Sequence, residues 1–187
     1  MAGADPSYKD VHLLRTLLKL HETTLGRKNL VKYLGIGEGS VRTIIKKLSS
    51  AGLIDSSKTG HMLTHEGEKY VDNIMSRISA PAHVELGDFL PGDTCAVKVT
   101  GIGLDRGDWV DLRDIALKNG ADGAVILVND GKLRFPSKDM DIDDYPLVRK
   151  ALSDMEGPDK GAIVIGFSAN LAKAEDGALS IVQKLLE

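Results

Sequence analysis

The chain has 187 residues, of which 42% are hydrophobic and 27% charged, with one cysteine and a formal net charge of -3. These proportions are typical of a folded globular protein and exclude a disordered, collagen-like or coiled-coil chain. The charge is unevenly distributed, because residues 1–80 hold 12 Lys/Arg and 8 Asp/Glu, whereas residues 81–187 hold 12 and 19. We therefore expect a basic domain of residues 1–80 that faces an anionic partner, a linker of residues 81–93, and an acidic domain of residues 94–187.

The sequence also indicates where the protein works. Cys95 has no second cysteine in the chain with which to form a disulfide, which fits a reducing compartment. No apolar run approaches the length of about 18 residues that a membrane span needs, and residues 1–10 lack the pattern of a signal peptide. We expect a cytoplasmic protein that does not enter a membrane.

In the basic half, the spacing of apolar residues predicts helices over residues 8–23, 26–34 and 38–50. Two short strands, residues 53–56 and 61–63, flank a polar turn, and Thr64 is expected to cap a fourth helix that runs to about Ile78. On the third helix the predicted buried residues are Val41, Ile44, Ile45 and Leu48. The residues expected on or beside its solvent face are Ser40, Arg42, Thr43, Lys46 and Lys47.

Three helices, a hairpin and a further helix are the order of a winged helix-turn-helix. Three motifs strengthen the resemblance to prokaryotic regulators of that class: Ser40-Val41-Arg42 through Lys47-Leu48, Ala51-Gly52-Leu53-Ile54, and Leu63-Thr64-His65-Glu66-Gly67. The resemblance covers about residues 8–78. It implies a recognition helix that enters the major groove of double-stranded DNA and a wing that reaches the neighbouring backbone or minor groove.

The residue types on these elements suit contacts to nucleic acid. Arg42, Thr43 and Lys46 are the candidates for groove contacts, with Ser40 and Glu38 as secondary ones. The candidates for phosphate are Lys47 and Lys58, and His61 is a further candidate on the wing. The charge excess is modest, so a homodimer that reads two half-sites is expected. The alternative interpretation of this basic domain is a protein-docking or dimerisation module.

In the acidic half, the pattern predicts the order β-α-β-β-α-β-α. The predicted strands are residues 95–100, 124–128, 132–135 and 163–167, and the predicted helices are residues 108–120, 145–155 and 171–185. Asn129-Asp130-Gly131 is a strong hairpin signal between the second and third strands. This order predicts a two-layer sheet with helices largely on one face, and the whole chain is expected to be α+β.

A second resemblance lies in this acidic half. The runs Asp111-Leu112 through Ala116, Asn119-Gly120-Ala121-Asp122-Gly123-Ala124, Pro158-Asp159-Lys160-Gly161 and Ala174-Glu175-Asp176-Gly177-Ala178 resemble the GAD domain. That non-catalytic module occurs in bacterial-type aspartyl-tRNA synthetases and in an archaeal tRNA amidotransferase subunit. The combination of the two domains is similar to a family of uncharacterised archaeal proteins.

The sequence offers little sign of chemistry. The loop after the first strand of the acidic half, with Gly101, Gly103 and Arg106, is a candidate for holding a small anion or ligand beside the following helix. No recognisable nucleophile or metal motif is present, so neither an enzyme, a cofactor nor a metal is expected. The leading hypothesis is a transcriptional regulator whose GAD-like domain senses a small-molecule effector or mediates oligomerisation. The alternative is an RNA-binding accessory protein of tRNA metabolism or translation.

Overall fold

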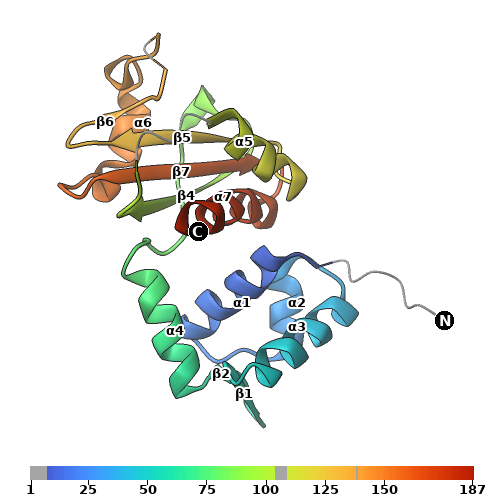
Figure 1. Ribbon diagram of the computed structural model, residues 1–187. Coiled ribbons are helices and arrows are strands. Elements are labelled where there is room, and N and C mark those ends of the chain that lie inside the picture. Colours follow the sequence, from blue (N-terminus) through green and yellow to red (C-terminus); the bar gives the residue numbers. More distant parts are fainter. Residues whose placement is uncertain (1–7, 104–108, 138) are drawn as a thin grey trace. The chain divides into compact units, whose positions relative to one another are not determined.

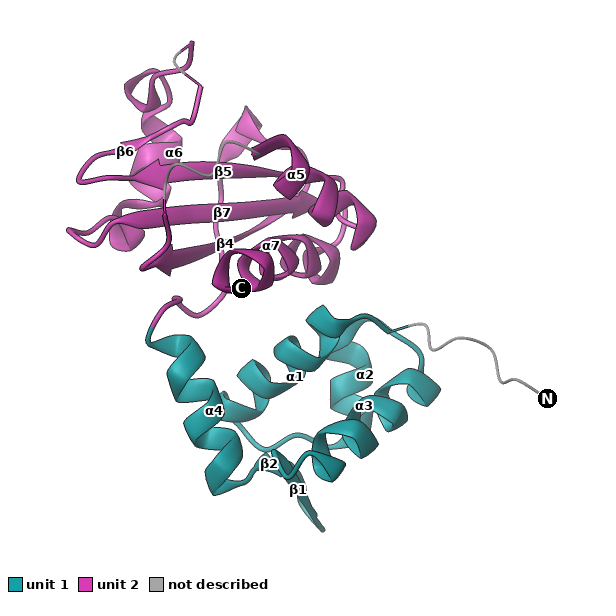
Figure 2. Ribbon diagram, viewed as in Figure 1, with its two compact units in different colours: residues 1–76 teal, residues 77–187 magenta. Residues whose placement is uncertain are grey.

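The computed structural model describes residues 8–103, 109–137 and 139–187. The chain divides into two compact units, residues 1–76 (unit 1) and residues 77–187 (unit 2), as Figures 1 and 2 show. Unit 1 is mainly helical and unit 2 is built on a sheet, which confirms the predicted α+β class.

Unit 1 begins with three helices, α1 (Asp10–Glu22), α2 (Arg27–Leu34) and α3 (Glu38–Ser50). Each one is amphipathic, and its apolar stripe points into the unit. The side chains at the centre of this core have no exposed surface: Leu30, Leu34, Val41 and Ile44. All three predicted helices are therefore confirmed, and α3 has the bounds that its sequence indicated.

A hairpin and a fourth helix complete unit 1. Strands β1 (Ile54–Ser57) and β2 (Gly60–Leu63) pair antiparallel, and α4 (His65–Met75) follows directly. The Thr64 hydroxyl accepts a hydrogen bond from the Gly67 amide at 3.0 Å, which confirms the predicted cap. A Cβ at Gly67 would overlap the Leu53 carbonyl, so this glycine allows α4 to approach the hairpin closely.

The hairpin is also attached to the connection between α1 and α2. The Leu25 amide donates to the His61 carbonyl at 3.1 Å, and the His61 amide donates to the Leu25 carbonyl at 2.9 Å. Gly60 has a φ of 138°, and a Cβ there would lie 2.7 Å from the Leu25 carbonyl carbon. The sequence did not reveal this bridge, because a single paired residue leaves no periodic pattern.

Unit 2 is built on a five-stranded antiparallel sheet with the order β3-β4-β7-β5-β6. Its strands are β3 (Ala82–His83), β4 (Asp93–Thr100), β5 (Gly123–Asn129), β6 (Leu133–Arg134) and β7 (Gly161–Ser168). The central strand β7 pairs along its whole length with β4 and over seven residues with β5. The predicted hairpin at Asn129-Asp130-Gly131 joins β5 to β6.

Helices lie on both faces of this sheet. Helix α7 (Leu171–Leu186) packs on one face, where the Ala174 carbonyl occupies the space of a Cβ at Gly166. Helix α5 (Trp109–Lys118) lies beside α7 (Figure 1). On the opposite face, Ile163 and Ile165 pack with Val148 of α6 (Pro146–Ala151). The prediction of helices on one face holds for α5 and α7, and α6 covers the other.

Residues 81–93, predicted as a linker, are part of unit 2. The segment from Arg77 to Val84 follows the outer edge of β4, where the Ser79 amide donates to the Lys98 carbonyl at 2.9 Å. Val84 and Leu86 are buried in the core on the face of the sheet that α6 covers. The stretch also contains the short strand β3 (Ala82–His83). Apolar side chains in this stretch, rather than its Pro and Gly content, decided its structure.

The two edges of the sheet differ in how far a neighbouring segment covers them. Residues 77–84 cover the outer edge of β4. By contrast, β6 pairs only with Val128 and Asn129 at the end of β5. Within the described part of the chain, no strand pairs with the outer edge of β5 from Gly123 to Leu127.

Candidate nucleic-acid interface

The solvent face of α3 carries three of the predicted groove contacts. Arg42, Thr43 and Lys46 are exposed, while Ile44 and Leu48 on the other side of the helix are buried. Arg42 and Lys46 are four residues apart, so their side chains lie above one another on one face. The helical pattern of the sequence was sufficient to predict this face.

Ser40 was wrongly predicted to lie on or beside the solvent face. It is only 8% exposed in the structure. The reason is its position four residues before the buried Ile44, which places both side chains on the same side of α3. Ser40 is therefore not a candidate contact.

Glu38 joins the two arginines at the start of this face. One of its carboxylate oxygens lies 3.1 Å from Nε of Arg27 and 3.7 Å from Nη2 of Arg42. All three side chains are about half exposed or more, so the pairs contribute little to stability. Their effect is to hold an arginine of α2 next to one of α3. The separation of Arg27 from α3 along the chain hides this contact in the sequence.

The other polar side chains of α3 differ in whether a neighbouring group already binds them. The Thr43 hydroxyl donates to the Gly39 carbonyl at 3.0 Å, which leaves its oxygen free to accept. The Lys47 ammonium lies 3.9 Å from an Asp10 carboxylate oxygen and 6.0 Å from the centre of the Tyr8 ring. Lys46 forms no ion pair with any residue that the structure describes. Lys46 is thus the cation on α3 most available to a ligand.

The turn of the hairpin presents Lys58 at its tip. The Ser57 hydroxyl accepts from the Thr59 amide and lies 3.2 Å from the Gly60 carbonyl, to which it donates. These bonds fix the backbone of the turn without using the Lys58 side chain, which is exposed. The position suits the phosphate contact that the sequence predicted.

His61 lies on β2, and its backbone pairs with Leu25, two residues before α2. Its Nδ1 is 2.8 Å from the Ser56 hydroxyl, and its side chain is half-buried. Burial, followed by the nearby positive charge of Arg27, lowers the pKa of His61 below its ordinary value. At neutral pH the imidazole is therefore uncharged and can offer a hydrogen bond but no positive charge.

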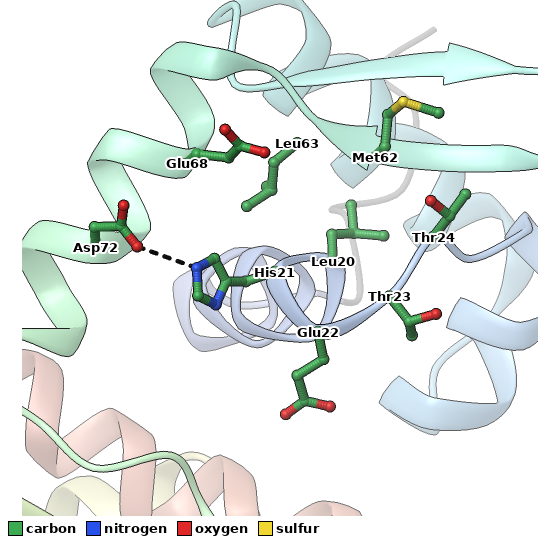
Figure 3. A pocket seen from close by; sticks show the side chains of 9 residues that line it. All are labelled: Leu20, His21, Glu22, Thr23, Thr24, Met62, Leu63, Glu68 and Asp72. Carbon is green, nitrogen blue, oxygen red and sulfur yellow. Dashed lines mark hydrogen bonds and ion pairs between the residues drawn. The ribbon is translucent and has the colours of Figure 1, made fainter.

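A cavity of about 440 Å³ in unit 1 has the opposite electrostatic character (Figure 3). It lies between the end of α1, strand β2 and α4, and its charged side chains include Glu22, Glu68 and Asp72. In Figure 3, His21 at the end of α1 reaches Asp72 of α4, at 3.1 Å. These carboxylates would repel a phosphate, so the cavity does not belong to a nucleic-acid interface.

Charge is thus segregated within unit 1. Helices α2 and α3 and the hairpin carry seven Lys/Arg and two Asp/Glu, whereas α1 and α4 carry three and five. We call the exposed side chains of Arg27, Arg42, Lys46 and Lys58 the basic face. A surface of this kind attracts polyanions through its field and contacts them through guanidinium and ammonium groups.

The predicted anion loop is only partly described. Gly101 follows β4 with a φ of 67°, and its amide donates to the Lys160 carbonyl at 3.3 Å. Gly103 is exposed, and Arg106 lies outside the described residues. The described portion of this loop therefore supplies no complete site.

Two further properties bear on function. Among the described residues, no group of three or more His, Cys, Asp or Glu side chains is arranged to hold a metal ion. None of the helices in the described ranges has both the length and the apolar character needed to cross a bilayer.

Comparison with known proteins identifies the family. The family model described as PH0730-like, N-terminal domain, matches residues 11–69, and that of DUF4443, a domain of unknown function, matches residues 91–185. The chain belongs to this PH0730-like family. It is 31% identical to the solved hypothetical protein PH0730 from Pyrococcus horikoshii OT3, with a TM-score of 0.80 over 96% of this chain and 93% of that chain. A comparison with curated proteins finds no match.

The comparisons confirm the expected similarity to an uncharacterised archaeal family. They attach no activity or partner to either domain. The resemblances to the winged helix-turn-helix and to the GAD domain stay predictions.

Proposed function

We propose that this protein is a DNA-binding transcriptional regulator. Unit 1 acts as a winged helix-turn-helix, and unit 2, as a GAD-like domain, senses a ligand or mediates oligomerisation. The observation that carries the proposal is the segregation of charge in unit 1: Arg42 and Lys46 of α3 and Lys58 of the hairpin are exposed, whereas α1 and α4 carry more acidic than basic residues. The protein is proposed to work in the cytoplasm without catalysing a reaction.

In this proposal α3 enters the major groove. The side chains of Arg42 and Lys46 meet base edges there, and Arg42 can donate two hydrogen bonds to one guanine. Thr43 borders them and offers its hydroxyl oxygen as an acceptor. The uncapped start of α3 at Gly37 presents backbone amides to a phosphate.

The hairpin then reaches the adjacent backbone. Lys58 contacts a phosphate, and the neutral His61 contributes a hydrogen bond. Lys47 serves a phosphate near the start of α1 after leaving Asp10. Glu38 gives up its contact with Arg42 when DNA binds, since a phosphate is the stronger partner for a guanidinium than an exposed carboxylate.

Specific recognition in this proposal requires a homodimer. One copy makes few phosphate contacts, whereas two copies related by a twofold axis read two half-sites. A ligand that binds one arrangement of the dimer better than another changes the spacing of the recognition helices and hence the affinity for DNA.

The test begins with genomic fragments selected on the full-length protein at low salt and then titrated by fluorescence anisotropy. The double variant Arg42→Ala/Lys46→Ala is expected to bind the selected DNA at least about tenfold more weakly, because two groove contacts are lost. Lys69→Ala is the matched control: it also removes a cation, but one on α4 that is paired with Glu66 at 3.2 Å. Selection that enriches nothing, or equal losses in both proteins, would refute the proposal.

The resemblance to a domain of tRNA enzymes favours one alternative, an RNA-binding accessory protein of tRNA metabolism or translation. Fold similarity alone does not transfer function. Titration of the same protein with total tRNA distinguishes the two. Competition by tRNA at concentrations below those of the selected DNA would support the alternative.

A further inference from the structure

Unit 2 contains a second recognition surface of a different kind. A cavity of about 430 Å³ opens beside the outer edge of β5. One wall is the first turn of α5, and the other is the segment that follows β6 (Figure 1 shows α5 alongside β5). We call this cavity the β5 pocket. Its volume lies within the range of small-molecule sites, about 300–1,000 Å³.

The lining of the β5 pocket is mostly apolar. It combines Trp109 and Val110 of α5, Val125 and Ile126 of β5, and Phe135 after β6. Val110 is 73% exposed and adds apolar surface to the open side of the pocket. An apolar concavity with one open side suits the hydrocarbon part of a small ligand.

The floor of the pocket consists of closely packed groups. Phe135 is 5% exposed and packs against two other rings, with centroids 5.9 Å from Phe89 and 5.5 Å from Tyr145. Strand β5 is held in place by its pairing with β7. A binding surface that is ordered before the ligand arrives avoids the entropic cost of ordering it.

One charged side chain lies in the lining of the β5 pocket. Arg113, one turn after Trp109 and Val110, is the single charged residue among those that line the cavity. It is exposed, and it forms no ion pair with any residue in the described ranges. The planar guanidinium is suited to a carboxylate, which it can bind through two parallel hydrogen bonds.

Two polar features can orient a ligand further. The outer edge of β5 presents backbone amide and carbonyl groups that pair with no described strand. Ser137 lines the other wall, where its hydroxyl accepts from the Asp139 amide at 3.2 Å and donates to an Asp139 carboxylate oxygen at 3.5 Å, so a ligand would reach it in competition with Asp139. An apolar pocket with a few convergent polar groups is the usual composition of a small-molecule site.

We propose that the β5 pocket binds a small apolar carboxylate, such as an aryl- or alkyl-carboxylic acid. Its hydrocarbon part lies between Trp109 and Phe135, and its carboxylate pairs with Arg113. This assigns a place and a ligand class to the sensing role of unit 2. The regulatory meaning of that binding rests on the proposed function, whereas the binding itself does not.

The experiment uses the fluorescence of Trp109, which is the only tryptophan of the chain. The full-length protein, without DNA, is titrated with phenylacetate and octanoate and, in parallel, with the neutral phenylacetamide and octanamide. A saturable change in emission is expected for the acids. The amides should bind at least about tenfold more weakly, since they lose a charge-assisted hydrogen bond.

Two variants with matched controls locate the site. Arg113→Gln should remove the preference for acid over amide, while Arg134→Gln, an arginine of unit 2 paired with Asp130, should keep it. Val110→Glu places a carboxylate at the mouth and should abolish binding of the acids. Leu117→Glu makes the same change on α5 outside the pocket, at another exposed residue, and should have no effect. All four side chains are largely exposed, so the variants are expected to fold.

Three results would overturn the proposal. Equal affinity for acids and amides would exclude recognition by Arg113, and the absence of any saturable change would exclude the ligand class. If the emission of Trp109 changes with protein concentration but not with added acid, this surface is instead a contact between two copies of the chain. Because DNA takes no part in the titration, failure of the DNA-binding proposal leaves its outcome unaffected.

Discussion

The basic face of unit 1 and the β5 pocket of unit 2 are built on different principles. The basic face consists of separate exposed cations of α2, α3 and a short hairpin. The β5 pocket has a single cation beside an open apolar concavity at the edge of a five-stranded sheet. The first suits a large, repetitive polyanion, whereas the second suits one small molecule. If both proposals hold, one chain of modest net charge recognises two unlike ligands.

The largest difference should be in sensitivity to salt. If the basic face makes about five phosphate contacts, raising salt from about 50 to 200 mM should weaken DNA binding about 10²–10³-fold. Phenylacetate binding should change less than about threefold over the same range, since a single ion pair is involved. Anisotropy and Trp109 emission measure the two affinities. Equal salt dependence would break the distinction between the two surfaces.

A substitution at Gly67 should affect the stability of unit 1 and leave the β5 pocket of unit 2 unchanged. Gly67→Ala forces α4 away from the Leu53 carbonyl and should lower the free energy of unfolding by about 1–3 kcal/mol. Circular dichroism during urea unfolding measures this loss. The native emission of Trp109 should stay unchanged, because that residue lies in unit 2.

Gly39→Ala is the matched control, since a Cβ at this helical position meets no atom within 4 Å. It should stabilise α3 by about 0.5–1 kcal/mol. If both variants have the same effect, α4 and the hairpin are less closely packed than described.

A smaller loss is expected at Thr64. Its hydroxyl accepts from the Gly67 amide at 3.0 Å and donates to the Gly52 carbonyl at 2.6 Å. Thr64→Ala removes the cap of α4 and should cost about 1 kcal/mol in thermal or urea unfolding. Thr59→Ala, at the exposed turn of the hairpin, should cost much less. The reverse order would contradict the role of the cap.

The smallest effect should be a pH dependence at His61. Because the pKa of His61 is lowered in the folded state, the unfolded chain binds a proton more readily below the ordinary value of 6.5. Stability should therefore rise with pH through that region and level off above it. His61→Gln should flatten the rise in urea unfolding measured across the same pH range. An unchanged slope would show that another group is responsible.

The sequence predicted the elements of both units better than it predicted their contacts. Apolar spacing placed α3 at its bounds, because burial leaves a periodic pattern, and the turn signal Asn129-Asp130-Gly131 placed the hairpin after β5. The prediction for Ser40 was wrong, although its position four residues before the buried Ile44 places it on the same side of α3. The pairing of residues 77–84 with β4 was not predicted, because a short segment at the edge of a sheet holds too few residues to show a hydrophobic pattern.

The candidate sites were predictable to unequal degrees. Arg42, Thr43 and Lys46 could be found because one helix supplies all three. The β5 pocket could not, because its walls come from α5, β5 and the segment after β6, which meet only through the fold. One local signal was available in the sequence. Trp109 and Val110 place apolar side chains on two neighbouring positions of α5, more than one buried face requires, and Arg113 follows one turn later.

The bridge between Leu25 and His61 has a consequence for how the hairpin would meet a ligand. Hairpins of two short strands are only marginally stable alone, and many order their backbone as they bind. Here the third segment, held by two hydrogen bonds, fixes the hairpin beforehand. The amides of Leu25 and His61 should therefore resist hydrogen exchange together, and the hairpin should dock as a rigid body. Little of its binding energy is then lost as conformational entropy.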